Sequence, residues 1–282
     1  AATLQPLEPA AKAIREAIER SRIKDTLLAK EGAVENFALV YPRERMNIVR
    51  RDFGPTAAEA MKRGSKPYRD LEALSMLTEA GFYKAELRRQ RQLVATSKTK
   101  AGRALTAKWD YALNNFDRIK NTPTKFRDEL DRQSALEKHN GVNQNYWNDY
   151  IPHIFDDDPK GFFGSFTPTS HGPGGTARWF TKSRSFPTLA DAVHEGEIPK
   201  TLNAADLGEL RLRAGQRLVM RKAYRELMQK LTVNGKPVAV DKPTHGYETM
   251  KLHGVDVHVN PEVADYVAML FEPRAVRRSM VG

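Results

Sequence analysis

The sequence predicts a mainly α fold: an antiparallel helical bundle with long amphipathic helices and a small antiparallel β element near the C-terminus. Three observations lead to this prediction. Apolar residues recur at intervals of three and four over much of the chain, which is typical of amphipathic helices. Proline and glycine stand mainly between these periodic segments. An Asn234-Gly235 turn and alternating valines are confined to about residues 231–260.

Residues 1–142 are predicted to form a basic helical region. A first helix is expected to begin near residue 7 and to end at Gly32, and residues 35–55 show no clean apolar period. Thr56 can cap a short helix, because its hydroxyl can accept a hydrogen bond from a backbone N–H of the first turn. A further helix is expected between about Pro67 and Gly81.

The segment from Tyr83 to about Asn121 contains no proline and carries a helical apolar stripe. It predicts one long helix, or two helices kinked at Gly102. Between Lys84 and Lys138 the chain has 14 Lys and Arg against 7 Asp and Glu, so this region holds most of the formal net charge of +11. A basic helical rod of this kind can lie along nucleic acid, and a solvated face of a bundle has the same pattern.

Residues 143–187 are predicted to be an aromatic and Gly/Pro-rich connecting segment. Its first part, NQNYWNDYIPHIFDDDP, is interpreted as a structural anchor between two layers, because large aromatic rings bury much area and proline restricts the backbone. The anchor residues are Tyr146, Trp147, Tyr150, Pro152 and His153. A metal site made of His153 and Asp156–Asp158 is the alternative, but adjacent aspartates diverge in direction and are typical of a solvated turn.

Residues 188–282 are predicted to form a second helical region with a small β-hairpin. A short helix is expected between Thr188 and Gly196, and a helix of about seven turns follows Asn203 with arginines on one face. The hairpin turn falls at Asn234-Gly235, and a last helix is expected to begin at Pro261.

The alternation of Asp256 and His258 with valines leaves a second metal hypothesis open, with His245 and His253 nearby in the sequence. The more ordinary interpretation is a strand with one solvated face. Neither metal hypothesis is adopted, so the sequence predicts no metal and no cofactor.

Basic side chains from three segments are the candidate contacts to nucleic acid, which they would grip through phosphates without reading base sequence. In the second segment, residues 178–184, they lie among aromatic rings that could stack on unpaired bases. The candidates are Arg88, Arg89, Arg91, Lys98, Lys100, Arg103, Lys108, Arg178, Lys182, Arg184, Arg213, Arg217 and Arg221.

Composition and motifs exclude several classes of protein. The chain has no cysteine, so disulfides, cysteine-ligated zinc and a thiol nucleophile are absent. No run of about 18 apolar residues predicts a membrane span, and no N-terminal segment resembles a secretory signal. The sequence contains no GxSxG, no HExxH and no P-loop, and HGPGG at residues 171–175 lacks the Lys-Ser/Thr that a P-loop requires. We therefore expect a non-enzymatic protein with no small-molecule substrate.

Three motifs in one order resemble a region of very large bacteriophage proteins, the polyvalent and internal virion (ejection) proteins. The motifs are NYWNDYIPHIF, RSFPTLADAVHEGEIPKTLNAADLGELRLR and GVDVHVNPEVADYVAMLFEP, and the likeness covers about residues 143–273. The resemblance implies a module of a virion component with a structural or DNA-associated role, and it carries over no catalytic residue. It also implies a location inside the phage virion or in the infected bacterial cytoplasm.

The leading functional prediction is thus a non-enzymatic structural module of a phage virion or DNA-ejection protein. Its expected partners are other virion proteins or copies of itself, with DNA as a further partner. The alternatives are a sequence-independent nucleic-acid-binding module and an unrecognised metal-dependent hydrolase. Because the first residue is alanine rather than methionine, we expect a processed product or a piece of a longer protein.

Overall fold

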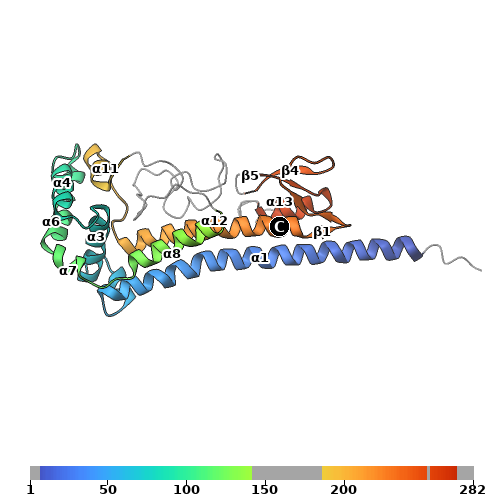
Figure 1. Ribbon diagram of the computed structural model, residues 1–282, viewed down its shortest axis with the longest axis horizontal. Helices are drawn as coiled ribbons and strands as arrows, with labels where there is room; N and C mark the ends of the chain where they lie inside the picture. The colour runs from blue at the N-terminus through green and yellow to red at the C-terminus, as the bar shows by residue number, and fades with distance from the viewer. Residues whose placement is uncertain (1–6, 142–185, 253–254, 272–282) are drawn as a thin grey trace, which may run out of the picture. The chain divides into compact units, whose positions relative to one another are not determined.

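The computed structural model describes residues 7–141, 186–252 and 255–271 (Figure 1). It is mainly α with a small antiparallel sheet near the C-terminus, which confirms the predicted fold class. The described chain divides into two compact units. The helical unit contains residues 38–141 and 186–216, and the sheet unit contains residues 7–37 and 217–271.

Two helices contribute residues to both units: α1 (Leu7–Phe53) and α12 (Ala204–Lys230). The division predicted from the sequence, into residues 1–142, 143–187 and 188–282, follows chain order. The compact units do not follow chain order, because each one combines a segment before the connecting region with a segment after it. Sequence periodicity reports local structure and does not indicate which distant segments pack together.

The prediction that the first helix ends at Gly32 is wrong. Helix α1 continues through Gly32 and through Pro42 to Phe53, so it includes the stretch that showed no clean period. A glycine in a helix interior costs about 1 kcal/mol relative to alanine and a proline about 3 kcal/mol. Side chains on both sides of Gly32 are buried, including Leu27 and Met46, and this tertiary packing outweighs the local preference.

The next two helices begin and end at the predicted signals. Helix α2 (Ala57–Met61) is capped by Thr56, whose hydroxyl accepts from the Glu59 backbone N–H at 3.1 Å. Helix α3 (Lys66–Glu79) has proline in its first turn, and Gly81 follows it with φ +57°. Glycine is favoured at that position because L side chains are strained at positive φ.

The predicted long helix from Tyr83 to Asn121 is not continuous. It consists of four shorter helices: α4 (Lys84–Ala95), α5 (Lys100–Ala104), α6 (Thr106–Asn114) and α7 (Phe116–Lys120). The first break lies at Thr96–Thr99, before the predicted kink at Gly102. There Ser97 donates its hydroxyl to the Val193 carbonyl at 2.5 Å, and the Lys98 N–H donates to the His194 carbonyl at 2.9 Å.

These bonds draw the chain toward α11 (Leu189–Glu195), a helix with the predicted boundaries. Thr188 and Asp191 form a capping box, and Gly196 ends the helix with φ +112°. Helices α3, α4 and α6 pack against one another, and α11 packs on α4. The basic rod expected along this segment is therefore a folded cluster of short helices.

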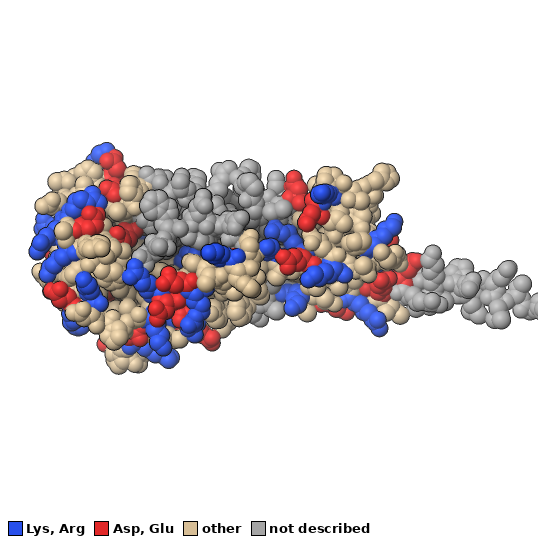
Figure 2. All heavy atoms as spheres, in the orientation of Figure 1, with Lys and Arg blue, Asp and Glu red and all other residues tan. Residues whose placement is uncertain are grey.

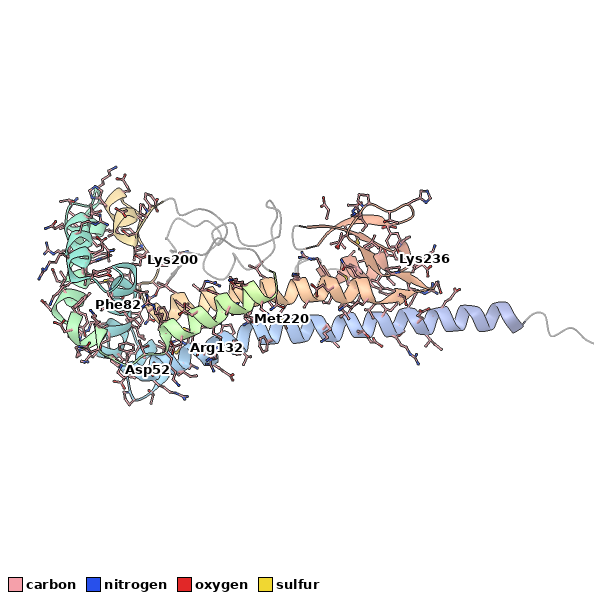
Figure 3. All side chains as sticks on the ribbon, in the orientation of Figure 1. Asp52, Phe82, Arg132, Lys200, Met220 and Lys236 are labelled. Carbon is pink, nitrogen blue, oxygen red and sulfur yellow. The ribbon has the colours of Figure 1, made fainter. Side chains whose placement is uncertain are left out.

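Helix α8 (Phe126–His139) runs antiparallel to the last part of α1 in the helical unit. Arg45 of α1 pairs with Glu129, whereas Asp52, at the end of α1, accepts from the Lys125 backbone N–H at 3.0 Å (Figure 3). Residue numbers thus rise along α1 as they fall along α8. This arrangement agrees with the predicted antiparallel packing of neighbouring helices.

Helices α8 and α12 run in the same direction, which the antiparallel prediction did not include. An ideal Cβ on Gly208 would lie 2.8 Å from Phe126 Cε2, and further along both helices Gln216 donates to the Gln133 side chain at 2.8 Å. Neighbouring helices that run in the same direction need a long crossover connection, and residues 140–203 separate these two. The core around them is apolar and includes Met46, Leu71, Leu77, Trp109, Phe126, Leu130, Leu207 and Leu212.

The close approach at Gly208 predicts that Gly208→Ala destabilises the helical unit. Its Cβ would lie 2.7 Å from Met46 Sδ and 2.8 Å from the Phe126 ring, so both side chains must shift. We expect a cost of about 1 to 3 kcal/mol from overpacking, partly offset by the helix preference of alanine. Urea unfolding followed by circular dichroism measures it. The cost should shrink in a Met46→Ala background, and an equal cost there would contradict this explanation.

The sheet unit contains the predicted small β element. A two-residue turn at Asn234-Gly235, with φ +49° and +74°, joins the first two strands as predicted. A three-stranded antiparallel sheet follows in the order β3-β5-β4, with Ala239 opposite Val259 and Glu248 also opposite Val259. The strands are β1 (Thr232–Val233), β2 (Lys236–Pro237), β3 (Ala239–Val240), β4 (Glu248–Leu252) and β5 (Val255–Val259).

Helix α13 (Pro261–Phe271) closes the sheet unit, and the Asn260 side chain accepts from the Glu262 N–H at 3.1 Å, as a cap does. The core of this unit joins side chains from its helices and its strands. Ile23 and Leu27 come from α1, and Tyr224 and Met228 come from α12. Strands β1 and β5 and the residue between β2 and β3 contribute Val233, Val257, Val259 and Val238, and α13 contributes Val263 and Val267.

Candidate functional site

Most of the predicted nucleic-acid contacts on α4 to α6 are already paired with carboxylates. The pairs are Arg89–Glu86, Arg91–Asp110, Lys98–Glu195 and Lys108–Glu72. Arg103 donates instead to the Ser97 carbonyl at 2.6 Å. Arg88, Lys100 and Arg103 of this group are exposed and have no ion pair to another described residue. On the face seen in Figure 2, Lys and Arg are interspersed with Asp and Glu.

The predicted contacts on α12 are also less available than the sequence suggested. Arg213 is half-buried and pairs with Glu209, Arg217 is half-buried, and the side chain of Arg221 lies outside the described side chains. Arg211, which the sequence placed on the same basic face, is buried with 2% of its surface exposed. Helical periodicity places residues on faces, but it does not show which face is covered by another helix.

Arg211 belongs to a buried polar network inside the helical unit. Its guanidinium donates to both Glu137 carboxylate oxygens, at 2.6 and 2.9 Å, and the Gln133 amide donates to the same carboxylate at 2.8 Å. Gly215 lies against this carboxylate, and an ideal Cβ there would overlap Glu137 Oε1 at 1.7 Å. The network is enclosed by α8 and α12, so it aligns these parallel helices and is not accessible to a ligand.

The predicted structural anchor lies outside the described residues, so it stays a prediction. The same holds for the metal alternative built on His153 and Asp156–Asp158. Three further candidate contacts to nucleic acid also lie there: Arg178, Lys182 and Arg184.

The second metal hypothesis has no support in the described residues. His258 is buried, and its Nδ1 lies 3.0 Å from the Thr249 hydroxyl across the β4–β5 pair. Asp256 and His245 are exposed, and His253 is outside the described residues. No group of three or more potential metal-ligating side chains is present among the residues that the structure describes.

A pocket of about 450 Å³ lies in the helical unit, and its volume falls within the range of small-ligand sites. It is lined by the end of the α2–α3 turn, one face of α3, one face of α6 with the residue before it, and the segment that enters α12. Its lining residues are Arg63, Gly64, Tyr68, Arg69, Glu72, Leu105, Ala107, Lys108, Tyr111, Pro199, Lys200, Thr201 and Leu202. Four are cations and one is a carboxylate, so the pocket is strongly positive.

The carboxylates at and below this pocket are neutralised by other side chains. Glu72 accepts from Lys108 Nζ at 2.6 Å. Asp70, whose side chain is 1% exposed, accepts from Arg118 through both of its oxygens, at 2.9 and 2.5 Å. Asp70 also accepts from Lys66 at 3.0 Å. These acids therefore neutralise little of the positive charge of the other lining residues.

Two tyrosines form a neutral part of the pocket wall. Burial raises the pKa of the Tyr68 hydroxyl, which hydrogen-bonds the Thr201 side chain, and burial with the neighbouring Asp70 raises the pKa of Tyr111. Tyr111 donates its hydroxyl to Asp70 at 2.7 Å. Both phenols stay protonated at neutral pH, so they add no negative charge to the pocket.

Three pocket cations have no carboxylate partner among the described residues: Arg63, Arg69 and Lys200. The Arg69 guanidinium lies 5.1 Å from the centre of the Tyr111 ring, which orients it without removing its charge. Lys200 lies on the segment that leads into α12 (Figure 3). Of the four cations only Lys108 was predicted from the sequence, because isolated basic residues on three distant segments carry no local motif.

Within the described part of the chain, no helix combines the length and apolar character needed to cross a bilayer. No family model matches the sequence, and no curated protein or solved structure matches it significantly.

Proposed function

We propose that this chain is a non-enzymatic structural module of a phage virion or DNA-ejection protein, which contacts neighbouring subunits and DNA. The phage assignment depends on the ordered motifs between residues 143 and 273. The observation that carries the DNA contact is unpaired positive charge in the helical unit. Arg63, Arg69 and Lys200 have no carboxylate partner among the described residues, and a polyanion would supply one.

The contact to neighbouring subunits is supported by apolar side chains that the helices leave exposed. Met61 and Tyr83 of the helical unit are 46% and 72% exposed, and Ile18 of the sheet unit is 48% exposed. Single exposed apolar residues are normal on a protein surface, so they support assembly only together with the resemblance. The proposed partners are other virion proteins or further copies of this chain.

Two measurements on the purified chain test this function. Its mass in solution reports assembly, and its affinity for single- and double-stranded DNA is measured over a salt series. We expect oligomers, and DNA binding at micromolar or lower Kd near physiological salt that weakens steeply as salt is raised. A monomer that binds neither kind of DNA would overturn the proposal. A monomer that binds DNA would favour the second candidate, a sequence-independent nucleic-acid-binding module, which the same unpaired cations support.

A further inference from the structure

We propose that the pocket between α3, α6 and residues 199–202 is the DNA contact of the helical unit, and that it holds phosphodiester groups of the backbone. This inference rests on the proposed DNA-binding function and locates it. The sequence pointed to the basic surface of α4 to α6 instead. The structure favours the pocket because three of its cations have no carboxylate partner among the described residues, whereas most of the cations predicted on α4 to α6 have one.

On α4 to α6, positive charges are largely balanced by neighbours. Three of the cations named there pair with carboxylates on or next to the same surface: Arg89, Arg91 and Lys98. A phosphate that bound these cations would have to compete with carboxylates already in place. Such contacts give little net affinity, because one ion pair is exchanged for another.

In the pocket the balance is different. Lys108 neutralises Glu72, so Arg63, Arg69 and Lys200 are left facing a shared concavity with no negative group of their own. A concave site concentrates the field of its cations more than a flat surface does. The chemistry that completes such a site is an oxyanion with several acceptor oxygens, and phosphate oxygens accept well from arginine and lysine.

The neutral residues of the pocket also suit a backbone phosphate. The Arg69 guanidinium is held over the Tyr111 ring, and that ring is anchored through its hydroxyl to Asp70, which Arg118 and Lys66 hold in turn. Arg69 is therefore positioned before a ligand binds, which lowers the entropic cost of binding. No aromatic face of the pocket is assigned to base stacking, since Arg69 covers Tyr111 and Tyr68 is buried. We accordingly infer contacts to phosphates rather than to bases, and thus no sequence preference.

The test compares two double variants that remove the same charge. The pocket variant is Arg63→Gln/Lys200→Gln, and the matched control is Arg88→Gln/Lys100→Gln. None of the four side chains has an ion pair with a described residue, so both variants should fold, which circular dichroism checks. The probe is a fluorescein-labelled 20-nucleotide oligothymidine, and anisotropy gives its Kd between 50 and 200 mM NaCl.

We expect the pocket variant to bind about tenfold more weakly, and its log–log salt slope to fall by roughly 0.7 for each lost phosphate contact. The control should lose much less affinity. Arg63→Lys/Lys200→Arg keeps the charges and should retain most of the binding. If the pocket variant binds as the wild type does while the control is weakened, the pocket assignment is overturned and DNA binding by the module stands.

Two other outcomes also overturn the assignment. Equal losses in both variants would mean that DNA senses only the total charge of the module. Calorimetric binding of inorganic pyrophosphate that depends on Arg63 and Lys200, with unchanged DNA affinity in the pocket variant, would assign the pocket to a small phosphorylated ligand. A wild-type chain that binds no oligonucleotide would remove both this inference and the DNA part of the proposed function.

Discussion

Arg211→Met is expected to lower the free energy of unfolding of the helical unit by about 3 to 5 kcal/mol, because it leaves the Glu137 carboxylate buried without its cation. Glu137 is completely buried, and Arg211 supplies both of its short ionic hydrogen bonds. The Gln133 amide cannot replace the guanidinium, because it donates a single neutral hydrogen bond. Urea unfolding followed by far-UV circular dichroism measures the loss.

Two further variants separate the buried charge from simple packing. In Arg211→Met/Glu137→Leu both charges are removed and apolar volume is kept, so most of the lost stability should return. Arg132→Met, also in the helical unit, removes an arginine whose side chain is 56% exposed and should change little (Figure 3). A double variant as unstable as the single one would contradict this explanation. It would show that the ion pair itself holds α8 against α12, and that the unpaired buried carboxylate is not the cause of the loss.

The second large effect is expected at Asp70, where Asp70→Asn should destabilise the helical unit by about 2 to 4 kcal/mol. This carboxylate accepts from Arg118, Lys66 and the Tyr111 hydroxyl, and the first two bonds are charge-assisted. An asparagine keeps the shape, but its neutral amide has one acceptor oxygen and adds two N–H donors that face cations. Asp117→Asn, at a side chain that is 79% exposed, is the matched control and should be nearly neutral.

Asp70 also predicts an acid dependence of stability. Burial alone would raise its pKa, but hydrogen bonds from Arg118, Tyr111 and Lys66 outweigh burial and lower the pKa below the ordinary value of 3.8. A lowered folded-state pKa means that the stabilisation is fully present above pH 3.8 and is lost as the pH falls through the lower folded-state value. Asp70→Asn should therefore lose less stability than the wild type on acidification below pH 4. Parallel stability curves for the two proteins would contradict this assignment.

The same variant connects stability with the proposed site. Asp70 holds the Tyr111 hydroxyl, and the Tyr111 ring orients Arg69 at the pocket. We expect folded Asp70→Asn to bind oligothymidine less tightly than Asp117→Asn does, although both lose one negative charge. If the affinity for DNA depended on net charge alone, removing an acid would strengthen binding in both variants.

The sequence by itself determined the features that depend on a few adjacent residues. The caps at Thr56, Thr188 and Gly196 and the Asn234-Gly235 turn lie where the sequence predicted them, because a cap or tight turn is satisfied by its own side chains and backbone. The mainly α class and the small antiparallel sheet follow from the apolar periodicity of single segments, so they were also predictable.

Tertiary structure alone decided how these elements continue, break and combine. Helix α1 passes Gly32 because buried residues on both sides hold it, and the helix expected after Tyr83 breaks at Thr96–Thr99 to reach α11. The sequence predicted Arg211 on an exposed basic face of its helix. In the structure α8 covers this arginine, and Glu137 of α8 pairs with it. The pocket likewise draws its cations from three segments that are far apart in the chain. In each case the deciding partner is remote in sequence, and its packing outweighs the local propensity.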